Sequence, residues 1–310
     1  MHNANAQKNQ NIYYLLNSGE EILFKDSADY IRVIQEPDSG GTYFNIREFY
    51  PNGVPKLLGS VSAFDPHIIY EGLVISYYKN GVKESAVTYK EGLPIGEAYY
   101  FFGNGRVKKQ VEYLESDPKA KVEERGLKLI YQVDTLGQVY VKDGNGRLIE
   151  RTINEKDTLI EEGNYKDGLK EGIWKGRYTS GKSSYIEEYG LAKFISGTQT
   201  IGDKMYEYAV LEVAPNFKGG IKEFYKYLGK SIRYPEDALS RNITGVVIVK
   251  FAIEKDGQIV DAEIVRSVFP SIDKETLRLV SGMPKWSPGF LRGVPVKMKY
   301  SLPVNFSISR

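Results

Sequence analysis

The sequence predicts an α+β protein: an N-terminal all-β array of hairpins, then a small α+β domain with an antiparallel sheet and two to three helices. Three observations predict this fold class. A turn motif with an aromatic residue and a glycine recurs through the first two hundred residues. The 24 tyrosines and 13 phenylalanines favour β structure. The last hundred residues combine alternating apolar runs with helical apolar spacing.

The recurring motif is aromatic-x-Asn/Asp/Ser-Gly, followed by a short β-prone run. Asn-Gly and Asp-Gly between alternating runs are strong hairpin signals. One such hairpin is too small to stand alone, so neighbouring hairpins must supply its apolar partner. We therefore expect one long twisted meander. Its turns are Tyr50–Gly53, Tyr78–Gly81, Phe102–Gly105, Tyr165–Gly168 and Tyr178–Gly181, with a degenerate copy at Val141–Gly144 and a second G-x-x-x-G spacing at Gly92–Gly96 and Gly168–Gly172.

This array, over about residues 43–185, resembles MORN-type repeats in the bacterial form called YwqK-type antitoxin repeats. The segment from Tyr78 to Tyr113 carries the resemblance best. Residues before Tyr43 and from Glu115 to Asn164 depart from the pattern. The resemblance implies a hairpin fold but no particular activity, because such arrays occur in many unrelated proteins.

The core of the C-terminal domain is a hairpin at Gly245–Arg266. Apolar residues alternate along both arms, and Asp256-Gly257 lies between them at a position that suits a tight turn. The alternating residues are Val247, Val249, Phe251 and Ile253 in the first arm, and Val260, Ala262 and Ile264 in the second. A longer alternating strand is predicted from Val296 to Phe306.

Three helices are predicted around this hairpin. The first lies between Gly220 and Gly229, and the second starts after the Tyr234-Pro235 break. The third covers Ser271–Gly282. Spacing of i, i+3, i+4 and i+7 predicts the buried stripe of the first helix. That stripe is Ile221, Phe224, Tyr225 and Leu228; the third helix has Ile272, Thr276 and Leu279, followed by Met283.

Seven short motifs in one order resemble the C-terminal domain of TonB proteins, over about residues 206–310. They are PNFKGG, SIRYPEDA, GVVIVKF, KDG, MPKWSPG, RGVPV and YSLPVNF. The resemblance implies that an outer-membrane TonB-dependent transporter supplies an extended segment, the TonB box, which pairs with the last strand. The partner-binding residues it implies are Ser231, Ile232, Arg233, Tyr234, Pro235, Val296, Met298, Tyr300 and Leu302.

TonB proteins also begin with a membrane helix that contacts a proton-driven motor, followed by a proline-rich spacer. No apolar run here approaches ~18 residues, and the 13 prolines are dispersed. An inner-membrane motor is therefore an expected partner only if an N-terminal anchor exists. Residues 3–7 resemble the tail of a cleaved signal peptide or an expression scar. We expect a periplasmic protein in a Gram-negative envelope, after removal of a signal peptide.

The predicted organisation is a disordered tail at 1–11, the hairpin array at 12–202, a linker or strand at 203–214, and the C-terminal domain at 215–310. Charge follows this division. Residues 215–310 carry 16 Lys and Arg against 9 Asp and Glu, a net +7, whereas residues 1–214 carry −5. A basic module can steer towards an acidic peptide, a lipid surface or nucleic acid, but scattered basic residues also fit a solvated surface.

The composition argues against catalysis, cofactors and metal sites. Without cysteine the chain has no thiolate ligands or nucleophile, and of two histidines only His67 lies outside the N-terminal tail. Adjacent carboxylates at Glu123-Glu124, Glu161-Glu162 and Glu187-Glu188 would point to opposite faces of a strand, so we expect solvated edges there. Trp286 is expected in the core.

We therefore expect a non-enzymatic protein with no cofactor, no metal, no nucleic acid and no small-molecule substrate. Its first candidate function is binding of TonB-dependent transporters by β-strand addition, contributing to energy-coupled uptake. The alternative is a MORN-like scaffold of the cell envelope whose TonB-like domain does not transduce energy. The sequence does not identify the native N-terminus, the partner and its cargo, the oligomeric state or the function of the repeats.

Overall fold

A computed structural model of the chain describes residues 9–64, 67–114, 126–154, 157–190 and 193–308. Their contacts form two compact units. The first comprises Met1–Ile153, Ile160–Trp174 and Gly190–Ala192; the second comprises Asn154–Leu159, Lys175–Tyr189 and Lys193–Arg310. The last repeat strands thus share a unit with the C-terminal domain. No helix among the described residues is long and apolar enough to cross a membrane.

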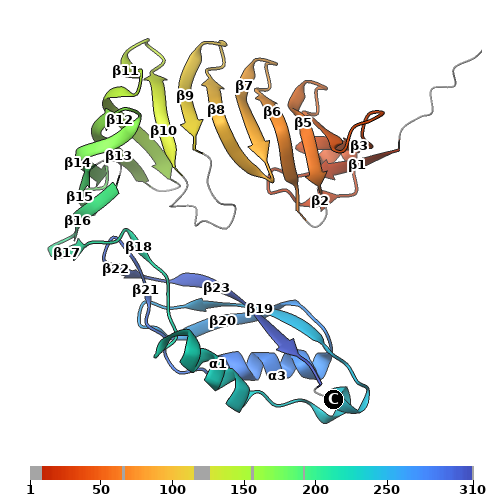
Figure 1. Cartoon of the computed structure of the whole chain (residues 1–310). Coiled ribbons are helices and arrows are strands. Elements are labelled where there is room, and N and C mark those ends of the chain that lie inside the picture. Colours follow the sequence, from red (N-terminus) through yellow and green to blue (C-terminus); the bar gives the residue numbers. More distant parts are fainter. Residues whose placement is uncertain (1–8, 65–66, 115–125, 155–156, 191–192, 309–310) are drawn as a thin grey trace, which may run out of the picture. The chain divides into compact units, whose positions relative to one another are not determined.

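The predicted hairpin array is confirmed as a 17-stranded sheet, in which β3 to β17 are hydrogen-bonded in chain order. Figure 1 shows β5 to β11 side by side. The strands are β1 (Gln10–Leu15), β2 (Glu21–Ile22), β3 (Tyr30–Gln35), β4 (Phe44–Phe49), β5 (Pro55–Ala63), β6 (Ile69–Tyr77), β7 (Lys83–Lys90), β8 (Leu93–Phe101), β9 (Val107–Tyr113), β10 (Leu127–Val133), β11 (Val139–Lys142), β12 (Asn145–Asn154), β13 (Asp157–Lys166), β14 (Leu169–Tyr178), β15 (Ser183–Gly190), β16 (Lys193–Ile201) and β17 (Lys204–Tyr208). A 3-10 turn, η1, covers Lys25–Ser27.

Strands also form where the repeat pattern is weak. β1 begins at Gln10, inside the stretch predicted as a disordered tail, and it pairs with β3 from Gln10 to Leu15. β10 to β13 continue the sheet through the segment that departs from the motif. Pairing with neighbouring strands therefore imposes the fold where local turn chemistry does not.

The array uses two kinds of turn. In the motif turns the glycine has a positive φ, as at Gly81, and the preceding Asn80 Oδ1 accepts a hydrogen bond from the Val82 backbone N–H at 3.1 Å. The Tyr78 hydroxyl donates to the backbone oxygen of Phe101 at 2.7 Å, which ties one repeat to the next. In the second kind, as at Asp167-Gly168, both residues have positive φ, which is typical of a two-residue type I′ turn.

Buried side chains, most of them aliphatic, run through the interior of the array, about one to each strand. Ile34 lies opposite Ile46, and Val74 lies opposite Val87, all of them buried. Further along, an aromatic ring covers a glycine: a Cβ added at Gly163 would lie 2.2 Å from the Trp174 ring. Trp174 is 2% exposed, so the glycine provides the space that its ring fills.

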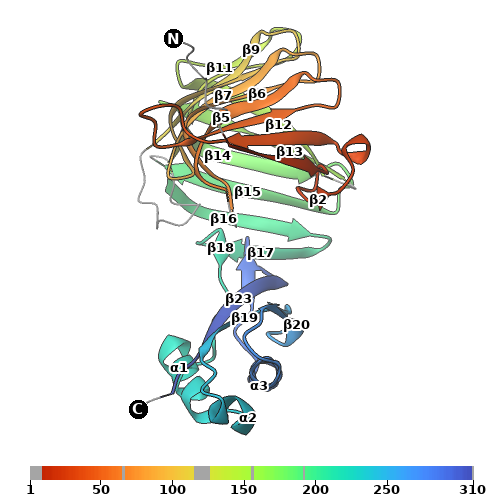
Figure 2. The ribbon, with the colours of Figure 1, turned by 90° about the vertical axis from the view of Figure 1, so that its right-hand side faces the viewer.

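The second unit contains the predicted α+β domain. Its helices are α1 (Gly220–Ser231), α2 (Glu236–Ser240) and α3 (Pro270–Ser281). One three-stranded sheet has the order β20-β19-β23, and a smaller one has the order β18-β21-β22. The strands are β18 (Glu212–Val213), β19 (Gly245–Ile253), β20 (Ile259–Arg266), β21 (Gly289–Leu291), β22 (Val294–Val296) and β23 (Met298–Phe306). Figure 2 shows α1 and α3 on the same side of this sheet.

Two details of the predicted domain are wrong. The stripe of α1 is buried at Phe224, whereas Ile221 and Tyr225 are exposed, because Tyr227 and Leu228 supply the rest of the contact with the core. The predicted strand from Val296 to Phe306 is two strands. Val296 pairs with Gly289 in β22, and Met298 begins a new ladder with Ile253 of β19.

Candidate functional site

Strand β23 is an edge strand. It pairs with β19 over its whole length, from Met298 opposite Ile253 to Phe306 opposite Gly245, and the register has no shift. Within the described residues no strand pairs with its other side. An edge of this length presents a row of backbone N–H and C=O groups that can pair with another chain.

Pro303 shows which residues face this open edge. It pairs with Ile248 but has no N–H, so it suits a position whose N–H would point away from β19. Because backbone direction alternates along an antiparallel strand, Lys299, Ser301 and Asn305 share that orientation. The edge therefore offers N–H donors at Lys299 and Ser301 and lacks one at Pro303.

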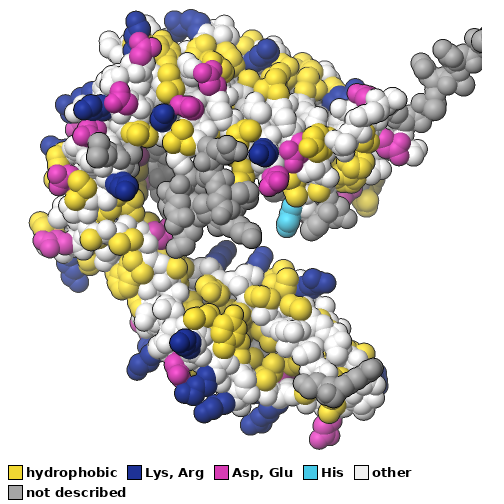
Figure 3. Space-filling model, viewed as in Figure 1, with side chains coloured by type: hydrophobic (Ala, Val, Ile, Leu, Met, Phe, Trp, Pro, Cys, Tyr) yellow, Lys and Arg dark blue, Asp and Glu magenta, His cyan; other side chains and the backbone are white. Residues whose placement is uncertain are grey.

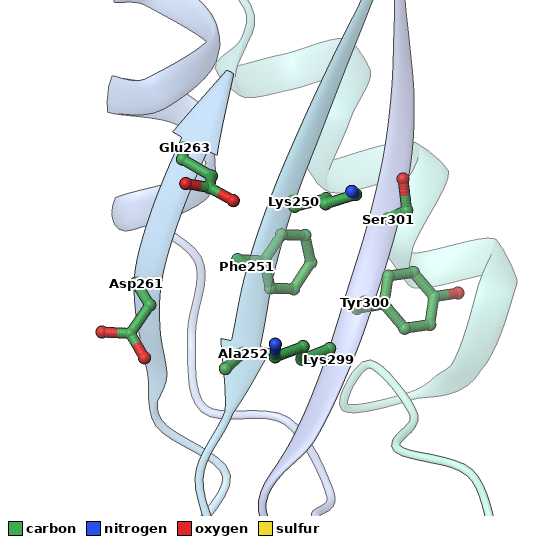
Figure 4. Close-up of a pocket in the computed structure, with 8 residues that line it drawn as sticks. All are labelled: Lys250, Phe251, Ala252, Asp261, Glu263, Lys299, Tyr300 and Ser301. Carbon is green, nitrogen blue, oxygen red and sulfur yellow. The ribbon is translucent and has the colours of Figure 1, made fainter. Parts of the chain in front are cut away.

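The same residues project from the face of the sheet that the helices leave open. A groove of about 410 Å³ lies on this face, drawn in Figure 4. Acidic side chains come from β20, and basic ones from β19 and β23. Its lining residues are Lys250, Phe251, Ala252, Asp261, Glu263, Lys299, Tyr300 and Ser301. Lys297 bridges Asp261 and Glu254 at 2.7 and 2.8 Å, whereas Lys250, Glu263 and Lys299 form no ion pair within the described part of the chain.

Of the side chains that the sequence assigned to β23, Leu302 faces the core, whereas Tyr300 packs against the core and also lines the groove. Leu302 is 7% exposed, and Met298 and Tyr300 are partly buried. The Tyr300 ring contacts Trp286, with centroids 5.3 Å apart. Trp286 is itself buried, as predicted. These residues therefore shape the strand, while a partner would meet its backbone and the side chains of Lys299 and Ser301.

The segment Ser231–Pro235 is held against α3 by Glu275. This carboxylate accepts hydrogen bonds from the Arg233 backbone N–H and from Arg278 Nε, both at 2.7 Å. Arg278 also donates to the Ser231 backbone oxygen at 2.6 Å. Burial would raise the pKa of Glu275, but the bonds from Arg278 and Arg233 outweigh it and lower that pKa.

The remaining predicted residues of this segment have different surroundings. Ile232 packs against the core, while the Arg233 side chain is exposed. Tyr234 donates to the Ile243 backbone oxygen and contacts the Phe306 ring edge-on. Pro235 precedes α2. The structure therefore brings Tyr234 to the end of β23, and the Arg233 side chain is the one in this segment that is free to meet a partner.

The expectation of solvated carboxylates is wrong at Glu187, which is buried. Its Oε1 accepts hydrogen bonds from Arg292 Nε at 2.6 Å and from the Tyr208 hydroxyl at 3.0 Å. Tyr189 donates to the other oxygen at 2.9 Å. The Arg292 guanidinium lies over the Tyr185 ring, 3.8 Å from its centroid. We call these five residues the latch; Glu123-Glu124 lies outside the described residues.

No group of three potential metal ligands occurs in the described residues, and His67 is exposed in a bend. Sequence reasoning missed the part that Lys299 and Ser301 take in this edge, the hydrogen bonds of Glu275 that hold Ser231–Pro235, and the latch. Only Pro303 pointed to the first of these, since it marks an edge strand.

An open edge strand on a small helix-backed sheet is the kind of surface at which other proteins add a foreign strand. Residues 230–308 match the family described as the Gram-negative bacterial TonB protein C-terminal, so the chain carries a TonB C-terminal domain. The match confirms the recognition made from the seven motifs, although it begins near the end of α1. The search of curated proteins returns no match. The family match does not cover the hairpin array, so its similarity to MORN-type repeats remains a resemblance.

Proposed function

We propose that this protein is a non-enzymatic TonB-family protein of the Gram-negative periplasm, which binds TonB-dependent transporters of the outer membrane and contributes to energy-coupled uptake. The TonB box of the transporter would add to β23 as a fourth strand. An inner-membrane proton-driven motor would be a further partner if the native chain has an N-terminal anchor. The observation that carries this proposal is the unpaired edge of β23 in a TonB C-terminal domain.

Two features of the edge support strand addition. The backbone of β23 is regular, so its outward N–H and C=O groups keep the spacing that a paired strand needs. The core-facing residues Leu302, Val304 and Phe306 are buried, which fixes the strand before any partner arrives. A preformed edge loses little conformational entropy on binding.

The test is binding of the full chain to synthetic peptides from transporter plug segments, measured by fluorescence anisotropy. Ser301→Pro removes the edge donor, and Ser301→Ala keeps it. We expect the Ala variant to bind like the parent chain and the Pro variant to lose at least about tenfold in affinity, the loss expected for one or two missing backbone hydrogen bonds. Circular dichroism and the melting temperature show whether both variants are folded. Equal binding by both variants would contradict strand addition at this edge.

A second candidate is an envelope scaffold whose TonB-like domain does not transduce energy. The observation that favours it is the size of the array, because the 17-stranded sheet is far larger than the TonB C-terminal domain. Plug peptides that fail to bind any version of the chain would leave this alternative in place.

A further inference from the structure

Helix α1 presents an apolar pair to solvent. Ile221 and Tyr225, four residues apart, share one helix face and are 59% and 65% exposed. On the buried side, the Phe224 ring lies 5.7 Å from Trp286, which contacts Tyr300 of β23. Helix α3 packs beneath β20 and β19. Helix α1 thus lies on the β23 side of the sheet, as Figures 2 and 4 show.

Lysines flank this apolar pair. Lys218, Lys222, Lys226 and Lys230 follow one another at intervals of four residues, so those within α1 lie along one face. Only Lys226 forms an ion pair within the described residues, with Glu223 at 3.2 Å. In Figure 3 the Lys and Arg side chains gather over α1. This surface is therefore suited to a partner with negative charge.

A strand added to β23 would point its side chains alternately to the two faces of the sheet. Those opposite Lys299 and Ser301 would lie on the open face, where Lys299 and Lys250 have no carboxylate partner among the described residues. Those opposite Tyr300 would point to the helix face, where α1 lies on the β23 side of the sheet. The two faces of the sheet therefore favour different side chains at alternate positions of the added strand.

We propose that the β23 edge selects an acidic extended segment of a partner protein, with carboxylates facing Lys299 and apolar side chains reaching Ile221 and Tyr225. This inference rests on the strand addition proposed above and adds the chemistry of the partner. Pro303 places the contact at the Lys299–Ser301 end of the strand.

The test uses the full chain and two labelled ten-residue peptides, in which valine alternates with glutamate or with lysine. We expect the glutamate peptide to bind at least about tenfold more tightly at low salt. Lys299→Glu should reverse this preference, whereas Lys274→Glu on α3, with the same change in net charge, should not. Ile221→Ser with Tyr225→Ser should weaken binding about tenfold. Val265→Ser, an exposed apolar residue of β20, is its matched control.

The inference is overturned if the two peptides bind equally or if neither binds. If plug peptides still bind in that case, and Ser301→Pro weakens their binding, strand addition stands and only the proposed chemistry of the partner is wrong. Binding of vesicles of anionic phospholipid that is lost on Lys222→Glu but kept by Ser301→Pro would assign α1 to a membrane surface instead. Peptide binding that persists in Ser301→Pro would show that the lysines act without the strand edge.

Discussion

Arg292 donates from Nε to the buried carboxylate of Glu187 across 105 residues of sequence, at 2.6 Å. Arg292 and Gly293 form the tip of the β21–β22 hairpin, and both have positive φ. Glu187 belongs to β15, a strand of the repeat sheet. The C-terminal domain is therefore joined to the last repeats by a buried ion pair as well as by the chain itself.

Arg292→Ala should destabilise the second unit strongly. It leaves the Glu187 carboxylate buried without its cation, a change that typically costs about 3 kcal/mol. Hydrogen exchange of the full chain should show faster exchange in β15 and β17. Lys226→Ala, which removes an exposed ion pair, should change stability by less than about 1 kcal/mol. Equal effects of the two substitutions would mean that the latch is no stronger than a surface pair.

Glu275→Gln should destabilise the domain in a pH-dependent way. The folded-state pKa of Glu275 lies below its ordinary value of 4.5, so its contribution is present above pH 4.5 and is lost as pH falls through the lower folded pKa. At pH 7 we expect a loss of about 1.5–3 kcal/mol from the charged hydrogen bonds. In denaturant melts the difference from the parent chain should shrink below pH 4.5. A difference that stays constant from pH 7 to pH 3 would contradict this assignment, and Glu236→Gln on α2 is the exposed control.

Gly257→Ala should be strongly destabilising, because Gly257 has a φ of 84° and an added Cβ would lie 1.9 Å from the Trp286 backbone oxygen. We expect a loss of more than about 2 kcal/mol. Gly229 provides the matched control: it lies within α1, and an added Cβ would meet nothing within 4 Å. Gly229→Ala should stabilise the chain by about 0.5–1 kcal/mol. Thermal melts that rank the two variants in the opposite order would refute the turn geometry.

Tyr50→Phe and Tyr78→Phe should each weaken the array by about 1 kcal/mol. Each hydroxyl donates to a backbone oxygen near the next turn, Tyr77 for Tyr50 and Phe101 for Tyr78. Hydrogen exchange in β5 to β9 should rise in both variants. The double variant reports whether the two contacts act independently. No increase in exchange in either variant would show that stacking of repeats does not depend on these bonds.

The sequence predicted the local parts of the fold well. The motif turns, the 245–266 hairpin and α3 depend on neighbouring residues, such as Asp256 and Gly257, and they appear as expected. The prediction of the buried face of α1 was wrong because the apolar residues of this helix fit two overlapping stripes. Packing of Phe224 against Trp286 decides which stripe is buried. The burial of Glu187 could not be foreseen, since its cation comes from a hairpin far along the chain.

The sequence placed the candidate site on the last strand, where the structure has an unpaired edge among the described residues. The sequence indicated the last strand and its open edge, yet it assigned contact to Tyr300 and Leu302, which alternate towards the core. The break at Lys297, which sends Val296 to another sheet, follows from pairing with Gly289 and has no local signal.

Pro303 also protects the open edge of β23 from pairing with copies of the same strand. An unprotected strand edge can template copy after copy of its own chain, which leads to fibrils. A proline inside the edge interrupts such growth, and the neighbouring positive charge of Lys299 repels an identical strand. The edge can thus pair with a short strand of another protein without polymerising with further copies of this chain.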